Sequence, residues 1–209
     1  MSILIYKNSD DRIHEVSLQE FEKRLGIKYL HSLVFASNKY KEHIIKKTEK
    51  RLKRLNLKKM NLWMLALHQN EMERSKNHFF YVRWINHDLG YGVFAAQDIP
   101  ALCYVGEYLG VVCKRSGRKH RFNDYIFSYT VTDKNTPYII DAQQQGNFTR
   151  FINHDDYHPN LISRWVVKDG LTHIILFTNR SVKKNQQLTY DYGDYYWRSR
   201  PLPLSISEF

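Results

Sequence analysis

The chain has 209 residues, of which 43% are hydrophobic, and a formal net charge of +11. This length suits one domain, or one domain with an appendage, and the hydrophobic content excludes a disordered chain. No apolar run reaches the roughly 18 residues of a membrane span, so we expect none. Residues 1–7 hold too short an apolar stretch for a cleavable export signal. Export by a machinery that reads no such signal stays open.

The positive charge is concentrated in the first part of the chain. Residues 1–80 carry 17 Lys and Arg against 9 Asp and Glu, whereas residues 81–209 carry 15 against 12. This excess predicts an anionic partner such as DNA, chromatin or an acidic surface. A basic face that is merely solvated explains the pattern equally well.

The two cysteines, Cys103 and Cys113, have a spacing that fits neither a zinc cluster nor a disulfide framework. We therefore expect no metal site, and a reducing compartment. This predicts a cytoplasmic location in the cell that makes the protein.

Residues 1–80 are expected to form a basic helical region. Ser17-Leu18-Gln19-Glu20 has the pattern of a capping box, which predicts a short helix through Arg24 that ends near Gly26. A longer helix should begin near Ser37 or Asn38, because neither Pro nor Gly follows until well past Glu73; a break within it is allowed. Its apolar residues at near-heptad spacing should face the domain or a partner helix. They are Ile45, Leu52, Leu55 and Leu62.

Lysines and arginines cover the remaining surface of this helix, residues 38–75. It is the best candidate in the chain for contact with DNA or a nucleosome, although no base-reading motif accompanies it and basic amphipathic helices are common scaffolds. Packing on the fold and self-association as a homodimer are the other roles open to the region.

From Phe79 onward the sequence changes to short runs rich in Val, Ile, Tyr and Phe, separated by polar links that contain Gly or Asn. This pattern predicts many small strands and little helix. The predicted strands are Phe79–Trp84, Gly92–Ala96, Tyr104–Val112, Tyr125–Val131, Tyr138–Asp141, Arg164–Val167 and His173–Thr178.

The run from Gly146 to His154, closed by Pro159-Asn160-Leu161, is the most unusual stretch of the chain. It crowds polar groups that need hydrogen bonds, which indicates either a surface loop or a buried polar site. Phe148, Phe151 and Ile152 favour burial, because they can hold the segment against a core while its polar side chains point elsewhere.

A second unusual run extends from Gln187 to Trp197. Five of the eight residues from Tyr190 to Trp197 are aromatic, and Asp191 lies among them. An aromatic seam of the core accounts for such a run as readily as a functional site does.

Four motifs resemble, in the family's own order, the signatures of the SET-domain protein lysine methyltransferases. They are Gly90–Ala95, Gly106–Gly110, Arg150–His154 with Pro159-Asn160, and Leu188–Gly193. The resemblance covers roughly Tyr81 to Trp197 and nothing before it. It divides the chain into a basic helical N-terminal region (1–80), a SET catalytic domain (81–197) and a C-terminal tail (198–209).

The resemblance implies a mostly β fold of several small curved sheets beside the helical N-terminal region. Its C-terminal segment is threaded through a loop that the Asn-His stretch forms. Many eukaryotic members carry cysteine-rich flanking segments, and the chain is more similar to compact bacterial members, such as those of chlamydia-like organisms, which lack them. A bacterial effector of this kind would act in a host nucleus. The tail, with Pro201 and Pro203, is expected to be extended.

The activity that the resemblance implies is methyl transfer from S-adenosylmethionine to a lysine of a histone or histone-like protein. Tyr192 matches the family's catalytic tyrosine, and Tyr125 and Tyr108 are candidates for the wall of the lysine channel. Tyr190 lies where members carry Phe or Tyr, and its hydroxyl predicts a bias toward mono- or dimethylation.

The residues expected to bind the cofactor come from three places in the chain. Gly90, Tyr91 and Gly92 resemble a turn that approaches the methionine part of S-adenosylmethionine. Asn153 and His154 would meet its adenosine, Arg150 would brace this turn or face the donor, and Trp197 would stack on the adenine or pack in the core.

The link between His154 and Pro159, Asp155-Asp156-Tyr157-His158, is one residue longer than is usual in the family. His154, Asp155, Asp156 and His158 are metal-ligand residue types at close range, so a metal-dependent hydrolase is an alternative, although adjacent residues rarely converge on one ion. A chromatin-binding module without activity is a further alternative, against which the intact Tyr192, Asn153 and His154 argue.

Overall fold

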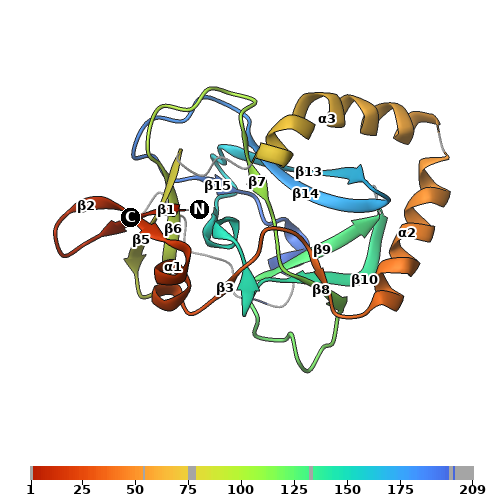
Figure 1. Ribbon diagram of the computed structural model, residues 1–209, viewed down its shortest axis with the longest axis horizontal. Helices are drawn as coiled ribbons and strands as arrows, with labels where there is room; N and C mark the ends of the chain where they lie inside the picture. The colour runs from red at the N-terminus through yellow and green to blue at the C-terminus, as the bar shows by residue number, and fades with distance from the viewer. Residues whose placement is uncertain (1, 54, 75–78, 132–133, 198–199, 201–209) are drawn as a thin grey trace.

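The computed structural model of the chain describes residues 2–53, 55–74, 79–131, 134–197 and 200. Several small β-sheets make up the centre, and two helices cover one side (Figure 1). This is the predicted class, mostly β with small sheets. The predicted tail, 198–209, lies outside the described residues apart from Arg200.

The N-terminal region begins with a hairpin that sequence reasoning did not predict. Strand β1 (Ser2–Lys7) pairs antiparallel with β2 (Arg12–Ser17) and parallel with β5 (Phe80–Asn86), which pairs with β6 (Gly90–Ala95). The description of residues 1–80 as helical is therefore wrong in part. The boundary at residue 80 runs through one sheet. Alternating burial explains the hairpin, since Ile3, Ile5 and Val16 enter the core.

Two further sheets form the body of the domain. One has the order β4 (Val34–Phe35), β8 (Val111–Lys114), β10 (Lys134–Asp141), β9 (Ile126–Val131). The other has the order β13 (Leu161–Lys168), β14 (Leu171–Thr178), β7 (Tyr104–Glu107). The predicted strand Tyr104–Val112 is thus two strands in different sheets. The chain crosses between them at Gly110, where a Cβ atom would lie 2.6 Å from the backbone oxygen of Asp141.

The predicted helices are present. Helix α1 (Leu18–Leu25) is capped by Ser17, whose hydroxyl accepts from the backbone N–H of Glu20, and ends at Gly26, with a φ of 63°. Helix α2 (Asn38–Leu52) begins after the cap residue Ser37. Helix α3 (Leu55–Arg74) follows after a break, in the long stretch expected to be helical.

The buried face of α2 and α3 is not the predicted one. The side chains that enter the core are those of Ile44, Thr48, Asn61, Met64 and His68.

Of the predicted heptad, Ile45 and Leu52 are only half-buried and Leu62 is 56% exposed, while the side chain of Leu55 lies outside the described part. The break between the helices changes the direction of the helix axis, so a single heptad cannot continue across it. Asn61 fixes α3 to the edge of β13, because its amide donates to the carbonyl of Val167 (2.9 Å) and accepts from the same residue's N–H (2.6 Å).

The segments that carry the site lie between these sheets. Strand β11 (Gln145–Gly146) pairs with β3 (Lys28–Tyr29), and the 3-10 helix η1 (Phe148–Phe151) follows. Strand β12 (Asn153–His154) pairs parallel with β15 (Thr189–Tyr190), and helix α4 (Asp194–Trp197) comes next. In the described part of the chain, no helix is both long and apolar enough to cross a bilayer.

Candidate active site

The two unusual stretches of the sequence meet in the structure. Asn153 lies opposite Thr189 and His154 opposite Tyr190 in the β12–β15 pair. On the other side of the C-terminal stretch, the N–H of Leu188 donates to the carbonyl of Val93 in β6 (2.8 Å). Residues 187–190 are thus held between β6 and residues 153–160. This is where the C-terminal segment predicted to thread through the Asn-His loop would lie.

Asn160 joins the two stretches through both ends of its side-chain amide. Its Nδ2 donates to the carbonyl of Gln187 (2.7 Å), and its Oδ1 accepts from the N–H of Thr189 (3.0 Å). The side chain is 1% exposed, so both hydrogen bonds are shielded from water. This arrangement fixes the register that places Tyr192 beside His154.

Tyr192 is held at both its backbone and its hydroxyl. Its N–H donates to Nδ1 of His154 (3.1 Å), the two rings have centroids 5.3 Å apart, and its hydroxyl donates to the carbonyl of Ile152 (2.8 Å). Burial holds the pKa of this phenol well above its ordinary value. Tyr192 is therefore a positioned, protonated hydroxyl at neutral pH, with an oxygen lone pair still able to accept a hydrogen bond.

A cavity of about 450 Å³ opens on one side of Tyr192. The predicted cofactor residues that line it are Gly90, Tyr91, Arg150, Asn153, His154 and Trp197. Gly90 has a φ of +68°, a conformation that favours glycine. Asn153 Nδ2 donates to the carbonyl of Tyr91 (3.2 Å), which ties the Gly90–Tyr91 turn to β12.

Two buried donors on the wall of this cavity have no partner within the described residues. They are Nε of Arg150 and Nε1 of Trp197. Buried donors are rarely left unpaired in native proteins, which indicates that a ligand or water pairs them here. A ligand with several hydrogen-bond acceptors and an aromatic ring fits this wall, because Trp197 and His154 also offer ring faces, with their centroids 4.8 Å apart.

Arg150 is a buried cation stacked between aromatic rings. Its guanidinium carbon lies 3.5 Å from the centroid of Tyr125 and 4.7 Å from that of Phe151, and Nη2 donates to the carbonyl of Gln143 (3.2 Å). Burial lowers the pKa of its guanidinium, although Arg remains charged in proteins. Tyr125 therefore supports Arg150 on the side of the larger cavity, which it also lines. It does not line the smaller cavity described next, where a channel-wall residue was expected.

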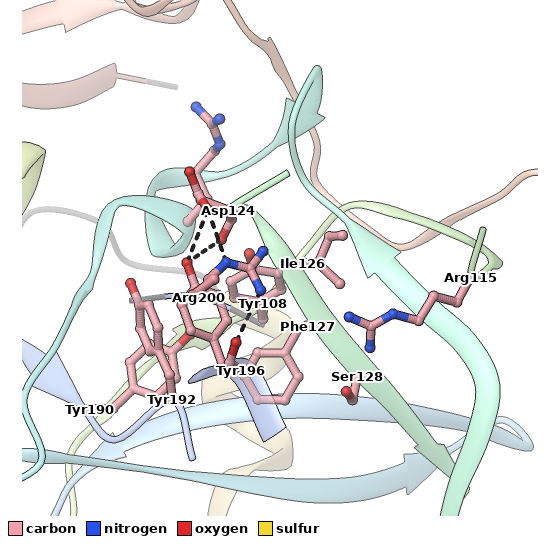
Figure 2. Close-up of a pocket in the computed structure, with 11 residues that line it drawn as sticks. Tyr108, Arg115, Asp124, Ile126, Phe127, Ser128, Tyr190, Tyr192, Tyr196 and Arg200 are labelled. Carbon is pink, nitrogen blue, oxygen red and sulfur yellow. Dashed lines mark hydrogen bonds and ion pairs between the residues drawn. The ribbon is translucent and has the colours of Figure 1, made fainter. Parts of the chain in front are cut away.

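Tyr192 also lines a smaller cavity of about 170 Å³ (Figure 2). Aromatic residues form one part of its wall, namely Tyr108, Phe127, Tyr190, Tyr192 and Tyr196, and charged residues form another, namely Arg115, Asp124, Arg150 and Arg200. Burial raises the pKa of Tyr108 and Tyr190 far above the ordinary range and that of Tyr196 to about 12. These phenols stay protonated at neutral pH. The aromatic part of the wall therefore offers neutral phenols and no tyrosinate to act as a base.

The two cavities share a wall. Asp124, Arg150, Tyr192 and Tyr196 line both of them. Two reactants that enter from opposite sides would meet beside the Tyr192 hydroxyl. Such a site can bring about a direct transfer of a group between two bound molecules by holding them close and aligned.

A family model of the SET domain matches residues 90–193. The chain is a SET-domain protein. The mouse (Mus musculus) histone-lysine N-methyltransferase EHMT1 is 36% identical over 118 residues, which are 53% of this chain and 9% of that protein. The chain thus spans only a small part of this curated relative.

Two solved structures share the fold. The structure of ATXR5 in complex with mono-methylated histone H3.1 has a TM-score of 0.60 at 17% identity, covering 85% of this chain and 86% of that one. The structure of Arabidopsis thaliana SUVH6 in complex with SAM has a TM-score of 0.50 at 26% identity, covering 59% and 30%. The fold is therefore of the SET type, whereas the compact bacterial subtype stays a prediction.

One predicted cofactor residue of this SET domain lies away from the cavities. Gly92 lines neither of them, and a Cβ atom there would lie 2.7 Å from Ile85 Cδ1, 3.0 Å from Gln187 Nε2 and 3.1 Å from Phe94 Cε2. That it approaches the cofactor stays a prediction. A side chain at this position would have to displace the ends of these neighbouring side chains, of which the nearest belongs to Ile85 in β5.

Seven of the residues that line the smaller cavity were not predicted as site residues, among them Asp124, Tyr196 and Arg200. Arg200 Nε lies 3.1 Å from Asp124 Oδ1, its Nη2 donates to the carbonyl of Asn123 (2.7 Å), and its guanidinium carbon lies 4.1 Å from the centroid of Tyr196 (Figure 2). The dense aromatic run could have indicated Tyr196. No local signal marks Asp124 or Arg200, which become neighbours only through the fold.

The predicted metal alternative gains no geometric support. Asp155 Oδ1 accepts from the N–H groups of Tyr157 and His158 (3.0 and 2.9 Å), which closes the longer link as a polar turn. His154 is engaged with Tyr192. The candidate ligands His154, Asp155, Asp156 and His158 do not form a metal-binding cluster in the described structure.

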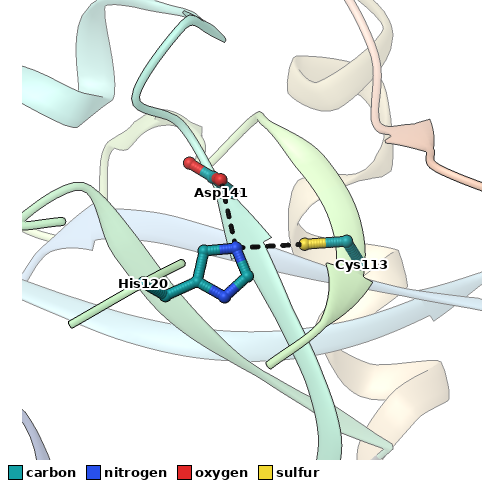
Figure 3. A group of neighbouring side chains, drawn as sticks. All are labelled: Cys113, His120 and Asp141. Carbon is teal, nitrogen blue, oxygen red and sulfur yellow. Dashed lines mark hydrogen bonds and ion pairs between the residues drawn. The ribbon is translucent and has the colours of Figure 1, made fainter. Parts of the chain in front are cut away.

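A different trio has the spacing of metal ligands: Cys113, His120 and Asp141 (Figure 3). However, Nδ1 of His120 accepts from the N–H of Ser116 (2.9 Å), so Nε2 carries the proton of the neutral ring. That proton faces Asp141 Oδ2 at 3.5 Å and Cys113 Sγ at 3.9 Å. Burial also raises the pKa of the Cys113 thiol. The trio is thus a hydrogen-bonded anchor, and a metal at Nε2 would have to displace its proton.

Proposed function

We propose that this SET domain transfers a methyl group from S-adenosylmethionine to the side-chain amine of a lysine in a histone or histone-like protein. The observation that carries the proposal is the meeting of two cavities of different character at one held tyrosine hydroxyl. Relatives named as histone-lysine N-methyltransferases, and the SAM complex of SUVH6, support the reaction and the cofactor.

The larger cavity is the proposed cofactor site. The Gly90–Tyr91 turn and β12 would hold S-adenosylmethionine, with Arg150 and Trp197 on the same wall. When bound, the cofactor supplies an electrophilic methyl group on a positively charged sulfur. The face of Trp197 suits its aromatic base.

The smaller cavity is the proposed site of the lysine. A free lysine amine has a pKa near 10.4 and must lose its proton before it can attack. Desolvation by the aromatic walls disfavours the ammonium form, and the nearby positive charge of the cofactor acts in the same direction. The walls also exclude water and tolerate a cationic methylated product at their ring faces.

Tyr192 positions the amine. Because its hydroxyl proton is directed to the carbonyl of Ile152, a lone pair of the oxygen remains to accept a hydrogen bond from the amine N–H. That contact would aim the nitrogen lone pair toward the other cavity. The raised pKa of the phenol excludes a tyrosinate base at neutral pH, so Tyr192 acts by orientation.

Tyr190 sets the proposed extent of methylation. It is 6% exposed, lines the smaller cavity, and has its ring centroid 4.8 Å from that of Tyr192. A hydroxyl at this position can hold a water molecule that competes for space with further methyl groups. We therefore include a bias toward mono- or dimethylation in the proposal.

The proposed partners follow from the surface of α2 and α3. The lysines of residues 38–75 support contact with nucleosomal DNA. The exposed apolar stripe of Met60, Trp63 and Leu67 supports self-association. The spacing of Cys103 and Cys113 fits no disulfide framework, and we therefore include in the proposal a reducing compartment, the cytoplasm of the producing cell. Delivery to a host nucleus belongs to the same proposal.

The decisive test is transfer of a radiolabelled methyl group onto recombinant nucleosomes, free histones and bacterial DNA-packing proteins. We expect Tyr192→Phe to lower the rate by about a hundredfold or more while binding of the cofactor, measured by calorimetry, is kept. Tyr157→Phe is the matched control, since Tyr157 is 71% exposed. Activity should resist a chelator. Cofactor binding by the wild type without transfer to any substrate would instead support a binding module.

A further inference from the structure

A strongly basic loop borders the smaller cavity. Residues 114–122 connect β8 toward β9 and contain five basic residues and no acidic one. The basic residues are Lys114, Arg115, Arg118, Lys119 and Arg121, and all five are exposed. Arg115 lines the cavity itself, and Figure 2 shows it at the end opposite Tyr190 and Tyr192. A substrate that enters this cavity must therefore pass close to the loop.

The anchor at His120 explains why the loop presents its cations outward. His120 is 5% exposed and is held by Ser116, Cys113 and Asp141 (Figure 3). Because this one side chain points inward, its neighbours Lys119 and Arg121 face solvent.

The same anchor fixes the loop relative to the cavity. Asp141 Oδ1 accepts from Nδ2 of Asn123 (2.8 Å), and Asn123 directly precedes the cavity residue Asp124. The loop is thus positioned by buried hydrogen bonds. Phe122, at 83% exposed, also gives it an apolar tip, which fits a contact surface better than a merely solvated one.

The loop is continuous with the basic helix α2. Strand β4, which leads into α2, pairs parallel with β8, which leads into the loop: Phe35 lies opposite Val112. Beyond this pair, Nζ of Lys114 lies 5.8 Å from the ring centroid of Tyr40 in α2. Helix α2 contains six basic and two acidic residues. Together, α2 and loop 114–122 form one surface, the basic tract, which ends at the cavity.

We propose that the basic tract binds duplex DNA, so that the acceptor lysine is presented to the smaller cavity beside the DNA. The role of the cavity in this inference rests on the proposed function. A lysine-rich histone segment alone would be repelled by the basic loop beside the cavity, and DNA between them reverses this repulsion. The tract also spans two separate elements, which matches a long polyanion better than a short acidic peptide.

The test uses a loop variant, Arg118→Gln with Lys119→Gln and Arg121→Gln, which leaves Arg115 in place. The control, Arg12→Gln with Lys23→Gln and Lys28→Gln, removes the same charge from exposed positions in β2, α1 and β3, outside the basic tract. Binding to a duplex of about 30 base pairs is followed by fluorescence anisotropy at several salt concentrations. Circular dichroism melts verify that both variants fold.

We expect the loop variant to bind DNA about tenfold or more weakly than the control, with a salt slope smaller by about 0.9 for each phosphate that the variant no longer neutralises. Its methylation of nucleosomes should fall, while that of a free histone peptide stays within about twofold or rises, because the repulsion at the entrance is removed.

Equal DNA affinity of the loop variant and the wild type would overturn the proposal. The proposal would also be overturned if the loop variant and the control lost the same DNA affinity, since that result would show only an effect of net charge. Weakened binding to a polyglutamate peptide with unchanged DNA binding would assign the loop to an acidic protein. If the wild type bound DNA through the tract but methylated no substrate, the proposed function would fail while the DNA site stood.

Discussion

Asn160 offers the most direct test of how the site is assembled, because a single side chain joins the two stretches that form it. Replacement by Asp keeps the shape of the side chain and the acceptor for the N–H of Thr189. It replaces the donor to the carbonyl of Gln187 with an oxygen. A protonated carboxyl can restore that hydrogen bond, whereas a carboxylate places two oxygens against each other at a site only 1% exposed.

The magnitude of the effect should therefore depend on pH. Burial and the Gln187 carbonyl raise the pKa of the introduced carboxyl above its unfolded value of about 3.9. A raised folded pKa means that the stability is fully present below the unfolded pKa and is lost as pH rises through the folded one. Each pH unit between the unfolded and the folded pKa lowers the free energy of unfolding of the variant by about 1.4 kcal/mol. The loss from this carboxyl is therefore about 1.5 kcal/mol at pH 5 and about 4 kcal/mol at pH 7.

Asn160→Ala provides the comparison. It removes both hydrogen bonds and leaves two buried backbone groups unpaired, at about 1–3 kcal/mol each, at every pH. The two variants should thus differ at pH 5 and converge toward pH 8. Asn179→Asp is the matched control, because its amide donates to the carbonyl of Pro159 (3.1 Å) at an exposed position. It should cost less than about 0.5 kcal/mol.

The measurement is urea unfolding followed by tryptophan fluorescence between pH 5 and 8, with each variant compared with the wild type at the same pH. A destabilisation by Asn160→Asp that does not change with pH would refute the reasoning, because the amide could not then be buried between two backbone segments. Methyl transfer should fall in parallel, since the register that places Tyr192 beside His154 depends on the same bonds.

Three further predictions follow from other parts of the structure. Burial alone lowers the pKa of His173, but the hydrogen bond and charge of Glu107 (2.8 Å) raise it by more, so the net shift is upward. The pair of His173 and Glu107 therefore stabilises the fold fully below about pH 6.5, and this contribution is lost as pH rises through the folded pKa of His173. Glu107→Gln should therefore lower the thermal midpoint at pH 6 more than at pH 9, and an equal loss at both would contradict the pairing. Tyr190→Phe should raise the methylation state of the product in mass spectrometry, and efficient trimethylation by the wild type would disprove its role. Asn61→Ala should destabilise the fold by about 2–5 kcal/mol in urea unfolding, because two groups of Val167 lose their partner; a loss below about 0.5 kcal/mol would show that α3 is not fixed there.

The local features of the chain were predictable because each is decided by residues close in sequence. Ser17 and Gly26 mark the ends of α1, since a side-chain cap and a left-handed residue act within one turn. The short strands after Phe79 were likewise readable from composition. The hairpin of residues 2–17 carries an alternating signal at Ile3 and Ile5, but its place in the fold depends on pairing with β5, far along the chain.

The sequence by itself determined the SET family, the polar stretch around Asn153 and the aromatic run around Tyr192, because motifs preserve the chemistry that a site needs. Only the tertiary structure decided which side chains complete that site. Asp124 and Arg200 are ordinary polar residues until the fold places them against partners many positions away. Asn160 lies in a motif, but its two partners in residues 187–189 are decided by the fold. Pairing of this kind depends on the whole packed core, and no local pattern of residues encodes it.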